Sequence, residues 1–335
     1  MAVFDTIITT VAISFLFAYL ATPVMAYIAQ KANLLDKPNK KKSHAHPTPL
    51  LGGAAVFFAF IAALSFTRFS DKALLGALVG GTVLVVAGIV DDKYGMGPKI
   101  KLRVQIISAL IAVIMGVRVV FIKMPPLAIL FTILWMVAMT NSFNLLDNLN
   151  GLSAGIAGIS ALFFGTIAFI HGDIPVALVS FALMGSCFGF LLHNFPKARI
   201  FMGDCGSLFL GFILAFIAVW GSWKTSSVTT SLAIPILILS YPLFDTILVT
   251  VKRLQVGRSI FQGGRDHSSH RLAILGFKKK RAVLVLYAVS FALGMAALAM
   301  TVVGPYFDMA IMVIAGGLLL LFGIQLGRVR IKYKT

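Results

Sequence analysis

The 335-residue sequence contains no glutamate, so all eleven of its acidic residues are aspartates. Charged side chains make up only 12% of the chain, whereas 59% of its residues are hydrophobic. It has just two cysteines, at positions 187 and 205, which are too few for a disulfide framework or a cysteine-ligated metal site. The shortage of charge excludes an ordinary soluble protein, because a chain of this length could not bury so much apolar surface.

Long apolar runs replace the missing charge. Each is about 20 residues long, enough to cross roughly 30 Å of hydrocarbon as a helix. We therefore expect an all-α, polytopic integral membrane protein that forms a single domain over residues 1–335. The sequence predicts about eleven membrane spans, at approximately 7–29, 51–67, 73–90, 103–121, 126–146, 151–171, 174–194, 207–223, 229–251, 281–303 and 306–326.

The positive charge is distributed unevenly between the two sets of loops. The net charge is +18, and 24 of the 29 Lys and Arg residues fall in one set of loops and in the C-terminal tail. By the positive-inside rule that set is cytoplasmic, which predicts an external N-terminus and an internal C-terminus. Loop asymmetry already explains the charge, so we do not expect nucleic acid as a partner.

Seven aspartates lie where the spans meet the same, internal set of turns. A carboxylate is costly to hold at a bilayer edge, so several on one face indicate a site that binds a cation. These residues are Asp36, Asp91, Asp92, Asp147, Asp204, Asp245 and Asp266.

The adjacent pair Asp91-Asp92 ends one span. Neighbouring carboxylates repel each other unless a cation or a proton intervenes, and Mg²⁺ prefers such oxygen ligands. A solvated pair at a helix end is the equally weighted alternative.

An Asn-rich segment, residues 141–152, begins near the end of the predicted span at 126–146. Asn144 and Asp147 are three residues apart and share a face if the helix continues, as do Asp147 and Asn150. We favour a functional role over a simple Asn-rich turn, because Asn144 would lie at membrane depth.

Asp204 stands between two glycines at the start of another span. Glycines permit a close backbone approach, and the first turn of the following helix offers free N–H groups to an anion. Asp204 could therefore hold a metal near a phosphate, or Asp204 or Ser207 could simply cap the helix.

The loop at residues 263–272 is basic and rich in histidine. Its His-x-x-His spacing is not that of a helical zinc site, so we interpret its side chains as anion ligands. Contact with anionic lipid is the alternative. The residues concerned are Arg265, His267, His270 and Arg271. Asp245, upstream, could join the site or pair with Lys252 or Arg253.

Taken in order along nearly the whole chain, these motifs resemble the bacterial polyprenyl-phosphate N-acetylhexosamine-1-phosphate transferases. The matching segments run from Asp36-Lys-Pro, Lys42-Ser-His44 and Pro47-Thr-Pro-Leu-Leu-Gly-Gly53, through Asp91-Asp92, Asn144, Asp147 and Phe201-Met-Gly-Asp204-Cys-Gly-Ser, to Asp266-His-Ser-Ser-His-Arg-Leu272.

The resemblance implies an enzyme of the bacterial inner membrane that moves a sugar-1-phosphate from a UDP-sugar to undecaprenyl phosphate and releases UMP. It implies Mg²⁺, with Mn²⁺ as a substitute, and leaves a homo-oligomer open. Its active-site loops would face the cytoplasm, at 30–50, 91–102, 144–151, 195–207 and 252–280.

Residue roles follow from the same resemblance. Asp91, Asp92 and Asp147 would be catalytic, with Asp91 meeting the lipid phosphate, and Asp204 and Asp92 would hold the metal. Substrate would be bound by Lys42, His44, Asn144, Asn150, Arg265, His267, His270 and Arg271.

One departure and three alternatives accompany this hypothesis. The family often has Asp where this chain has Asn150, which weakens a metal or proton-transfer role there and leaves a catalytically inactive lipid-binding scaffold as one alternative. The Asp-His-Ser-Ser-His-Arg loop favours an N-acetylglucosamine donor over muramoyl-pentapeptide transfer, the second. The third, an ion-coupled transporter, would need carboxylates near the bilayer midplane and paired repeats.

Overall fold

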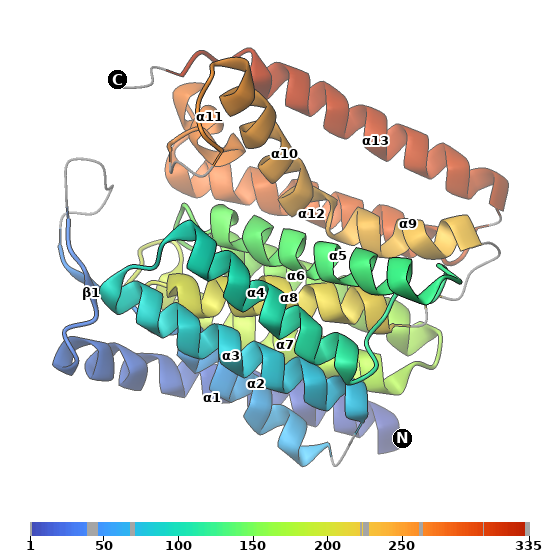
Figure 1. Cartoon of the computed structure of the whole chain (residues 1–335), viewed down its shortest axis with the longest axis horizontal. Coiled ribbons are helices and arrows are strands. Elements are labelled where there is room, and N and C mark those ends of the chain that lie inside the picture. Colours follow the sequence, from blue (N-terminus) through green and yellow to red (C-terminus); the bar gives the residue numbers. More distant parts are fainter. Residues whose placement is uncertain are drawn as a thin grey trace. The chain divides into compact units, whose positions relative to one another are not determined.

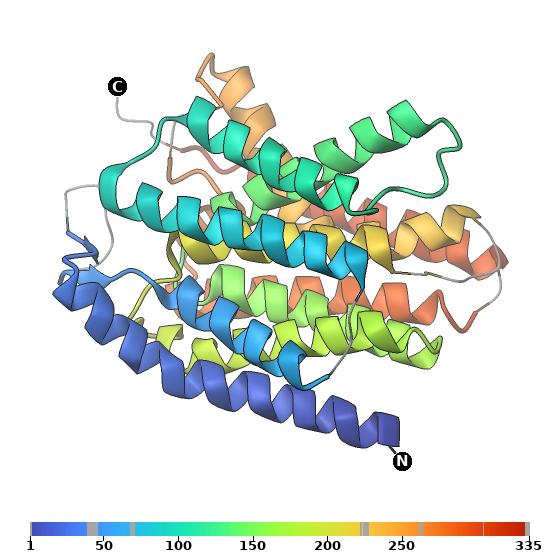
Figure 2. The ribbon, with the colours of Figure 1, turned by 60° about the horizontal axis from the view of Figure 1, so that its bottom comes forward.

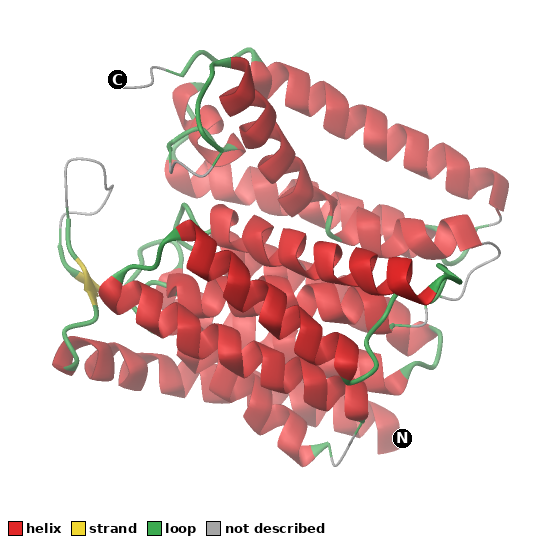
Figure 3. Ribbon diagram, viewed as in Figure 1, coloured by secondary structure: helices red, strands yellow, loops and turns green. Residues whose placement is uncertain are grey.

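The computed structural model confirms the all-helical class, with one short pair of strands besides the helices in the part of the chain it describes (Figure 3). The described residues are 2–38, 46–67, 71–221, 223, 228–260, 264–303 and 305–331. The helices are α1 (Ala2–Lys31), α2 (Gly52–Phe66), α3 (Lys72–Tyr94), α4 (Pro98–Ile114), α5 (Pro125–Leu146), α6 (Leu152–Ile170), α7 (Ile174–Asn194), α8 (Gly203–Trp220), α9 (Val228–Ile238), α10 (Ser240–Gln255), α11 (Ser268–Ile274), α12 (Lys279–Ala299) and α13 (Pro305–Gly327), and the strands are β1 (Leu35–Asp36) and β2 (Thr48–Pro49).

Among the described residues, eight helices are long and apolar enough to cross a membrane: α1, α3, α5, α6, α7, α8, α12 and α13. A ninth span results if Leu232–Ile238 and Ser240–Gln255, which meet at a bend of 67°, are counted as one broken span. Two expected spans are short: α2 has 15 residues and α4 has 17, or about 22 and 25 Å at 1.5 Å per residue. The polytopic class is confirmed, and the count of eleven spans stays a prediction.

The chain forms two compact units, Met1–Ser222 and Trp223–Thr335. In the first unit, α8 is the central helix and packs against α3 and α5 (Figures 1 and 2). Its phenylalanines are fully buried, among them Phe209, Phe212 and Phe216. Because α8 is apolar on all sides, it fits the interior of a bundle, and the polar residues of its first turn are held firmly in place.

The segment before α2 also fixes the start of α8. Strands β1 and β2 pair antiparallel, with Leu35 opposite Pro49, and Leu50 then bridges to Phe201. The backbone N–H groups of Gly52 and Gly53 donate to the carbonyls of Phe201 and Met202, at 2.9 and 2.8 Å. These bonds hold the turn that delivers Asp204.

In the second unit, α9 and α12 pack together, and α10 contacts α11, α12 and α13. Only 11% of the most apolar 18-residue stretch of α13 is buried, which suits a helix that faces lipid.

Candidate active site

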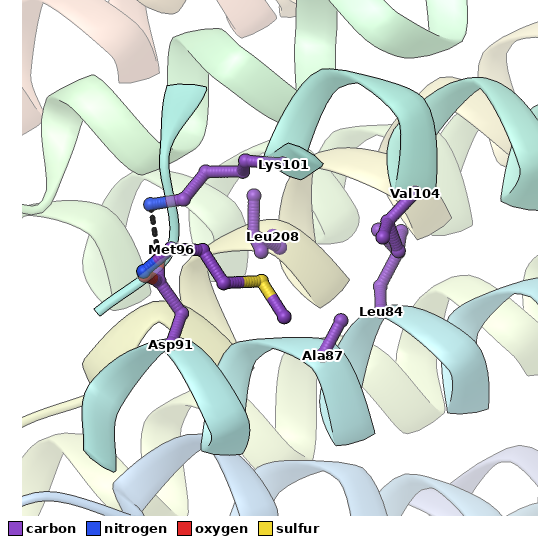
Figure 4. A pocket seen from close by; sticks show the side chains of 7 residues that line it. All are labelled: Leu84, Ala87, Asp91, Met96, Lys101, Val104 and Leu208. Carbon is purple, nitrogen blue, oxygen red and sulfur yellow. Dashed lines mark hydrogen bonds and ion pairs between the residues drawn. The ribbon is translucent and has the colours of Figure 1, made fainter. Parts of the chain in front are cut away.

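Three helices of the first unit bring two aspartates to one lysine. Asp91 lies in the last turn of α3. Because α4 begins after the short turn 95–97, Lys101 in its first turns lies close to Asp91. The Lys101 ammonium forms ion pairs with Asp91 Oδ2 and with Asp204 Oδ2, the latter at 2.5 Å. Figure 4 shows Lys101 reaching from α4 toward Asp91, above the apolar side chains Leu84, Ala87 and Leu208. The structure thus brings Asp91 and Asp204 together on one ammonium group.

Asp92 contacts the start of α8. Its Oδ1 accepts a hydrogen bond from the backbone N–H of Asp204 at 3.0 Å. Its Oδ2 is buried and has no hydrogen-bond partner among the described residues. Gly203 permits this contact, because its φ is +71° and an added Cβ would lie 2.5 Å from Asp92 Oδ2.

Asn144, in the last turn of α5, binds the carboxylate of Asp204, at the oxygen that Lys101 does not contact. Its Nδ2 donates to Asp204 Oδ1 at 2.7 Å and lies 3.0 Å from Ser207 Oγ. One turn deeper, Asn141 and Gln105 exchange two amide hydrogen bonds, of 2.6 and 3.2 Å. That pair joins α5 to α4 and fixes the rotation of α4 below Lys101.

Asp147 and Asn150 lie beyond the end of α5, because the helix stops at Leu146. The helical face that they were expected to share therefore does not form. Asn150 Nδ2 donates to Pro196 O at 3.4 Å, and Gly151 occupies the N-cap of α6. The N-cap of α8 is Met202, so the alternative that Asp204 or Ser207 caps this helix is wrong.

The charges of this cluster act on the two titratable groups that lie outside the membrane-spanning helices. Burial of the Asp147 carboxyl, together with the charges of Asp204 and Asp92, raises its pKa to about 8. Burial alone would lower the pKa of Lys101. The charge of Asp204 and the hydrogen bonds to Asp204 and Asp91 outweigh it and raise that pKa.

The donor set fits a hard divalent cation that also binds a substrate phosphate. Within the described residues no group of three or more Asp, Glu, His or Cys side chains is arranged to enclose a metal ion. Mg²⁺, however, is usually held by one or two carboxylates together with waters and phosphate oxygens. The buried, unbonded Asp92 Oδ2 and the partly exposed Asp204, whose side chain is 29% exposed, meet that requirement.

The second unit holds its own buried network of charged side chains. Asp245 lies 2.8 Å from His267 Nδ1 through Oδ2, and its Oδ1 accepts from Ser268 N at 2.7 Å. Arg253 binds Asp266 with two hydrogen bonds, of 2.7 and 2.8 Å. Asp245 therefore does not pair with Lys252 or Arg253, the alternatives that its sequence position suggested.

The predicted anion ligands of this unit have unequal access to solvent. Arg271 is 1% exposed and donates to the carbonyls of Asp266, Leu326 and Val329, so it ties α11 to the end of α13. Arg265 is exposed. Burial, the neighbouring His267 and the charge of Arg265 lower the pKa of His270 to about 4. His270 is therefore uncharged at neutral pH and can offer only a neutral hydrogen bond.

Two predicted substrate ligands, Lys42 and His44, lie outside the described residues. Conversely, two side chains of this site were not among the predicted ligands. Lys101 is the first of them, although its place one turn into the helix that follows the Asp pair could have marked it. Asn194 accepts from Gly151 N at 2.6 Å and donates to Ile200 O at 2.7 Å, which joins two predicted loops. No sequence pattern marked Asn194.

Residues 74–222 match the family model described as glycosyl transferase family 4. This range contains Asp91, Asp92, Lys101, Asn144, Asp147 and Asp204.

Curated relatives match over most of the chain. A Bacillus subtilis (strain 168) protein named as a probable undecaprenyl-phosphate N-acetylglucosaminyl 1-phosphate transferase is 33% identical over 87% of this chain and 84% of its own length. A Mycobacterium leprae decaprenyl-phosphate N-acetylglucosaminephosphotransferase is 31% identical over 80% of this chain and 77% of its own. The Escherichia coli (strain K12) undecaprenyl-phosphate alpha-N-acetylglucosaminyl 1-phosphate transferase is 26% identical over 81% and 78%.

Proposed function

The chain belongs to glycosyl transferase family 4, and we propose that it transfers N-acetylglucosamine-1-phosphate from a UDP-sugar to a polyprenyl phosphate, with release of UMP. The observation that carries the proposal is the cluster of Asp91, Asp92, Asp204 and Asn144 at the ends of three helices. The relatives supply the substrate class, since their names specify a polyprenyl phosphate and N-acetylglucosamine.

The reaction exchanges one phosphorus–oxygen bond for another. An oxygen of the lipid phosphate attacks the phosphorus that bears the sugar, and the bond from that phosphorus to the oxygen bridging it to UMP breaks. Such a reaction needs positioning and neutralisation of negative charge more than covalent help from the protein. The cation would be held by Asp204 and Asp92, and when bound it neutralises charge on the diphosphate.

The residues of the first unit divide this work. Asn144 holds Asp204 in one orientation through its 2.7 Å hydrogen bond, and Asp92 fixes the backbone of Asp204. Asp91 is assigned to the lipid phosphate, and Asp147 and Asn150 to the nucleotide side. For the second unit the proposal follows the resemblance: His267, oriented by Asp245, and His270 bind phosphate or sugar.

The membrane setting completes the proposal. The protein is a multi-pass protein of the bacterial inner membrane, its active-site loops face the cytoplasm, and its lipid substrate arrives within the bilayer. This orientation gives the water-soluble UDP-sugar access from the cytoplasm. Its support is the excess of Lys and Arg in the loops that carry the Asp residues.

The test is UMP release by the purified protein with undecaprenyl phosphate, Mg²⁺ and one of two donors, UDP-N-acetylglucosamine or UDP-muramoyl-pentapeptide. We expect release with UDP-N-acetylglucosamine, dependent on both lipid and Mg²⁺. Release only with the pentapeptide donor would reassign the substrate. No release from folded protein with either donor would contradict the proposed donors, and would make Asn150 the first position to revert to Asp.

A further inference from the structure

Lys101 occupies an unusual position among the carboxylates of the first unit. Its ammonium contacts Asp91 and Asp204 together, while Asp92 lies against the backbone of Asp204. One ammonium thus serves a cluster with three carboxylates. The Lys101 side chain is 22% exposed and that of Asp204 29%, so both remain reachable from solvent.

The position of Lys101 is set by the surrounding helices. The Gln105–Asn141 amide pair, one turn deeper, fixes α4 against α5, so the lysine backbone is held while its four-carbon stem can still turn. The Lys101 ammonium can therefore leave the carboxylates without any movement of a helix.

From this arrangement we propose that Lys101 is an internal counter-ion of Asp91 and Asp204 that competes with the divalent cation for the Asp204 carboxylate. Binding of the cation and release of the Lys101 ammonium are then coupled events. The inference rests on the proposed function, because it takes the metal to be held at Asp204 and Asp92.

Two physical arguments support the coupling. Asp204 Oδ2, 2.5 Å from the lysine Nζ, cannot keep this contact and also coordinate a cation strongly, since the two positive charges would repel each other. The lysine also offsets the mutual repulsion of the carboxylates, so the cluster stays assembled whether the lysine or the cation neutralises it. By linkage, whatever removes the lysine must strengthen the binding of the cation.

The test measures binding of Mn²⁺ alone, without substrate, to the purified full chain in detergent, from the electron paramagnetic resonance signal of free Mn²⁺. Lys101→Met should lower the dissociation constant for Mn²⁺ on the order of tenfold relative to the unsubstituted protein. Lys101→Arg, which keeps the positive charge, should restore the weaker binding. Lys101→Gln is the second neutral variant, for use if the methionine variant does not fold.

The matched control is Lys99→Met, which removes the same charge from an exposed position in the same helical turn. Its Mn²⁺ affinity should stay within about twofold of the unsubstituted protein, because exposed charges are screened by solvent and salt. Equal or weaker binding by folded Lys101→Met would overturn the inference and leave the proposed function intact. Binding by none of the variants would overturn the metal assignment as well.

Discussion

Asp204 receives contacts from three other helices. Two of them reach its carboxylate, and the third reaches its backbone N–H. Lys101 and Asn144 bind its two oxygens, and Asp92 binds its N–H. Asp204→Asn keeps the size of the side chain but removes the negative charge. We expect UMP release to fall by at least about 10³-fold, because the charge of the reacting phosphates would lose its cation.

The control for this substitution is Asp173→Asn, at the N-cap of α7. Asparagine caps a helix as well as aspartate does, so this variant should keep full activity. Both variants should remain folded in detergent, as measured by circular dichroism. An Asp204→Asn variant with normal UMP release would remove Asp204 from the metal site.

The pKa of Asp147 makes a prediction about stability. In an unfolded chain the pKa of an aspartate is about 3.9, whereas the folded protein raises the pKa of Asp147 to about 8. The folded state therefore binds this proton more tightly, and its stability falls as the pH rises from about 4 to about 8.

Asp147→Asn should remove this part of the pH dependence. Between pH 5 and pH 8 the melting temperature of the unsubstituted protein should drop more than that of the variant. The extra drop should be about 2–4 °C for each 1 kcal/mol that protonation of Asp147 contributes to the folding free energy. The measurement is thermal unfolding in detergent over this pH range, without divalent cation. Melting temperatures that change with pH by the same amount in the two proteins would contradict the raised pKa.

The sequence predicted the titratable residues better than the contacts between them. Aspartate at a bilayer edge is costly, so Asp91, Asp92 and Asp204 were marked by their positions alone. The partners of buried ions depend on side chains from distant segments, and no local pattern reports them. For this reason Lys101 was missed as a partner of Asp204, and the pairing of Asp245 with His267 was not foreseen.

At the scale of elements, the close approach of α3 to α8 brings the two carboxylate segments together. Gly88 lies on α3 one turn before Asp92, and an added Cβ would stand 2.3 Å from the backbone N and Cα of Cys205. Because those atoms are backbone, Gly88→Ala must push the two helices apart. A displacement of about 1 Å at a reacting centre costs on the order of 100-fold in rate, and we expect a loss of this size in UMP release.

Gly316→Ala is the control for this loss. Gly316 also lies inside an apolar helix, α13, but its added Cβ meets nothing within 4 Å. Alanine is favoured over glycine in a helix interior by about 0.8–1.0 kcal/mol, so this variant should be at least as stable and fully active. Normal UMP release by Gly88→Ala would show that the site tolerates a wider separation of α3 and α8.

Apolar runs predicted the helices well and their ends less well. Periodicity and length identify a span, but its first turn depends on local hydrogen bonds. The predicted span at 207–223 begins at Gly203 in α8, since the carbonyls of Phe201 and Met202 are bound by the segment before α2. That shift of one turn places Asp204 inside the helix instead of in a loop.

At the scale of the whole molecule, the unequal distribution of Lys and Arg predicts which loops face the cytoplasm. The loops that carry the Asp cluster belong to the basic set, and those near Arg118 and Lys123 to the other set. Both native cysteines, Cys187 and Cys205, are buried, so a cysteine introduced at the surface can be labelled selectively.

Lys197→Cys and Lys123→Cys test this orientation, because both lysines are exposed and lie in loops predicted to be on opposite sides. In intact inner-membrane spheroplasts, a maleimide that cannot cross the membrane should label the cysteine at position 123. It should label the one at position 197 only after the membrane is permeabilised. The reverse pattern would place the Asp cluster outside the cell, where no UDP-sugar is made, and would contradict the proposed function together with the orientation.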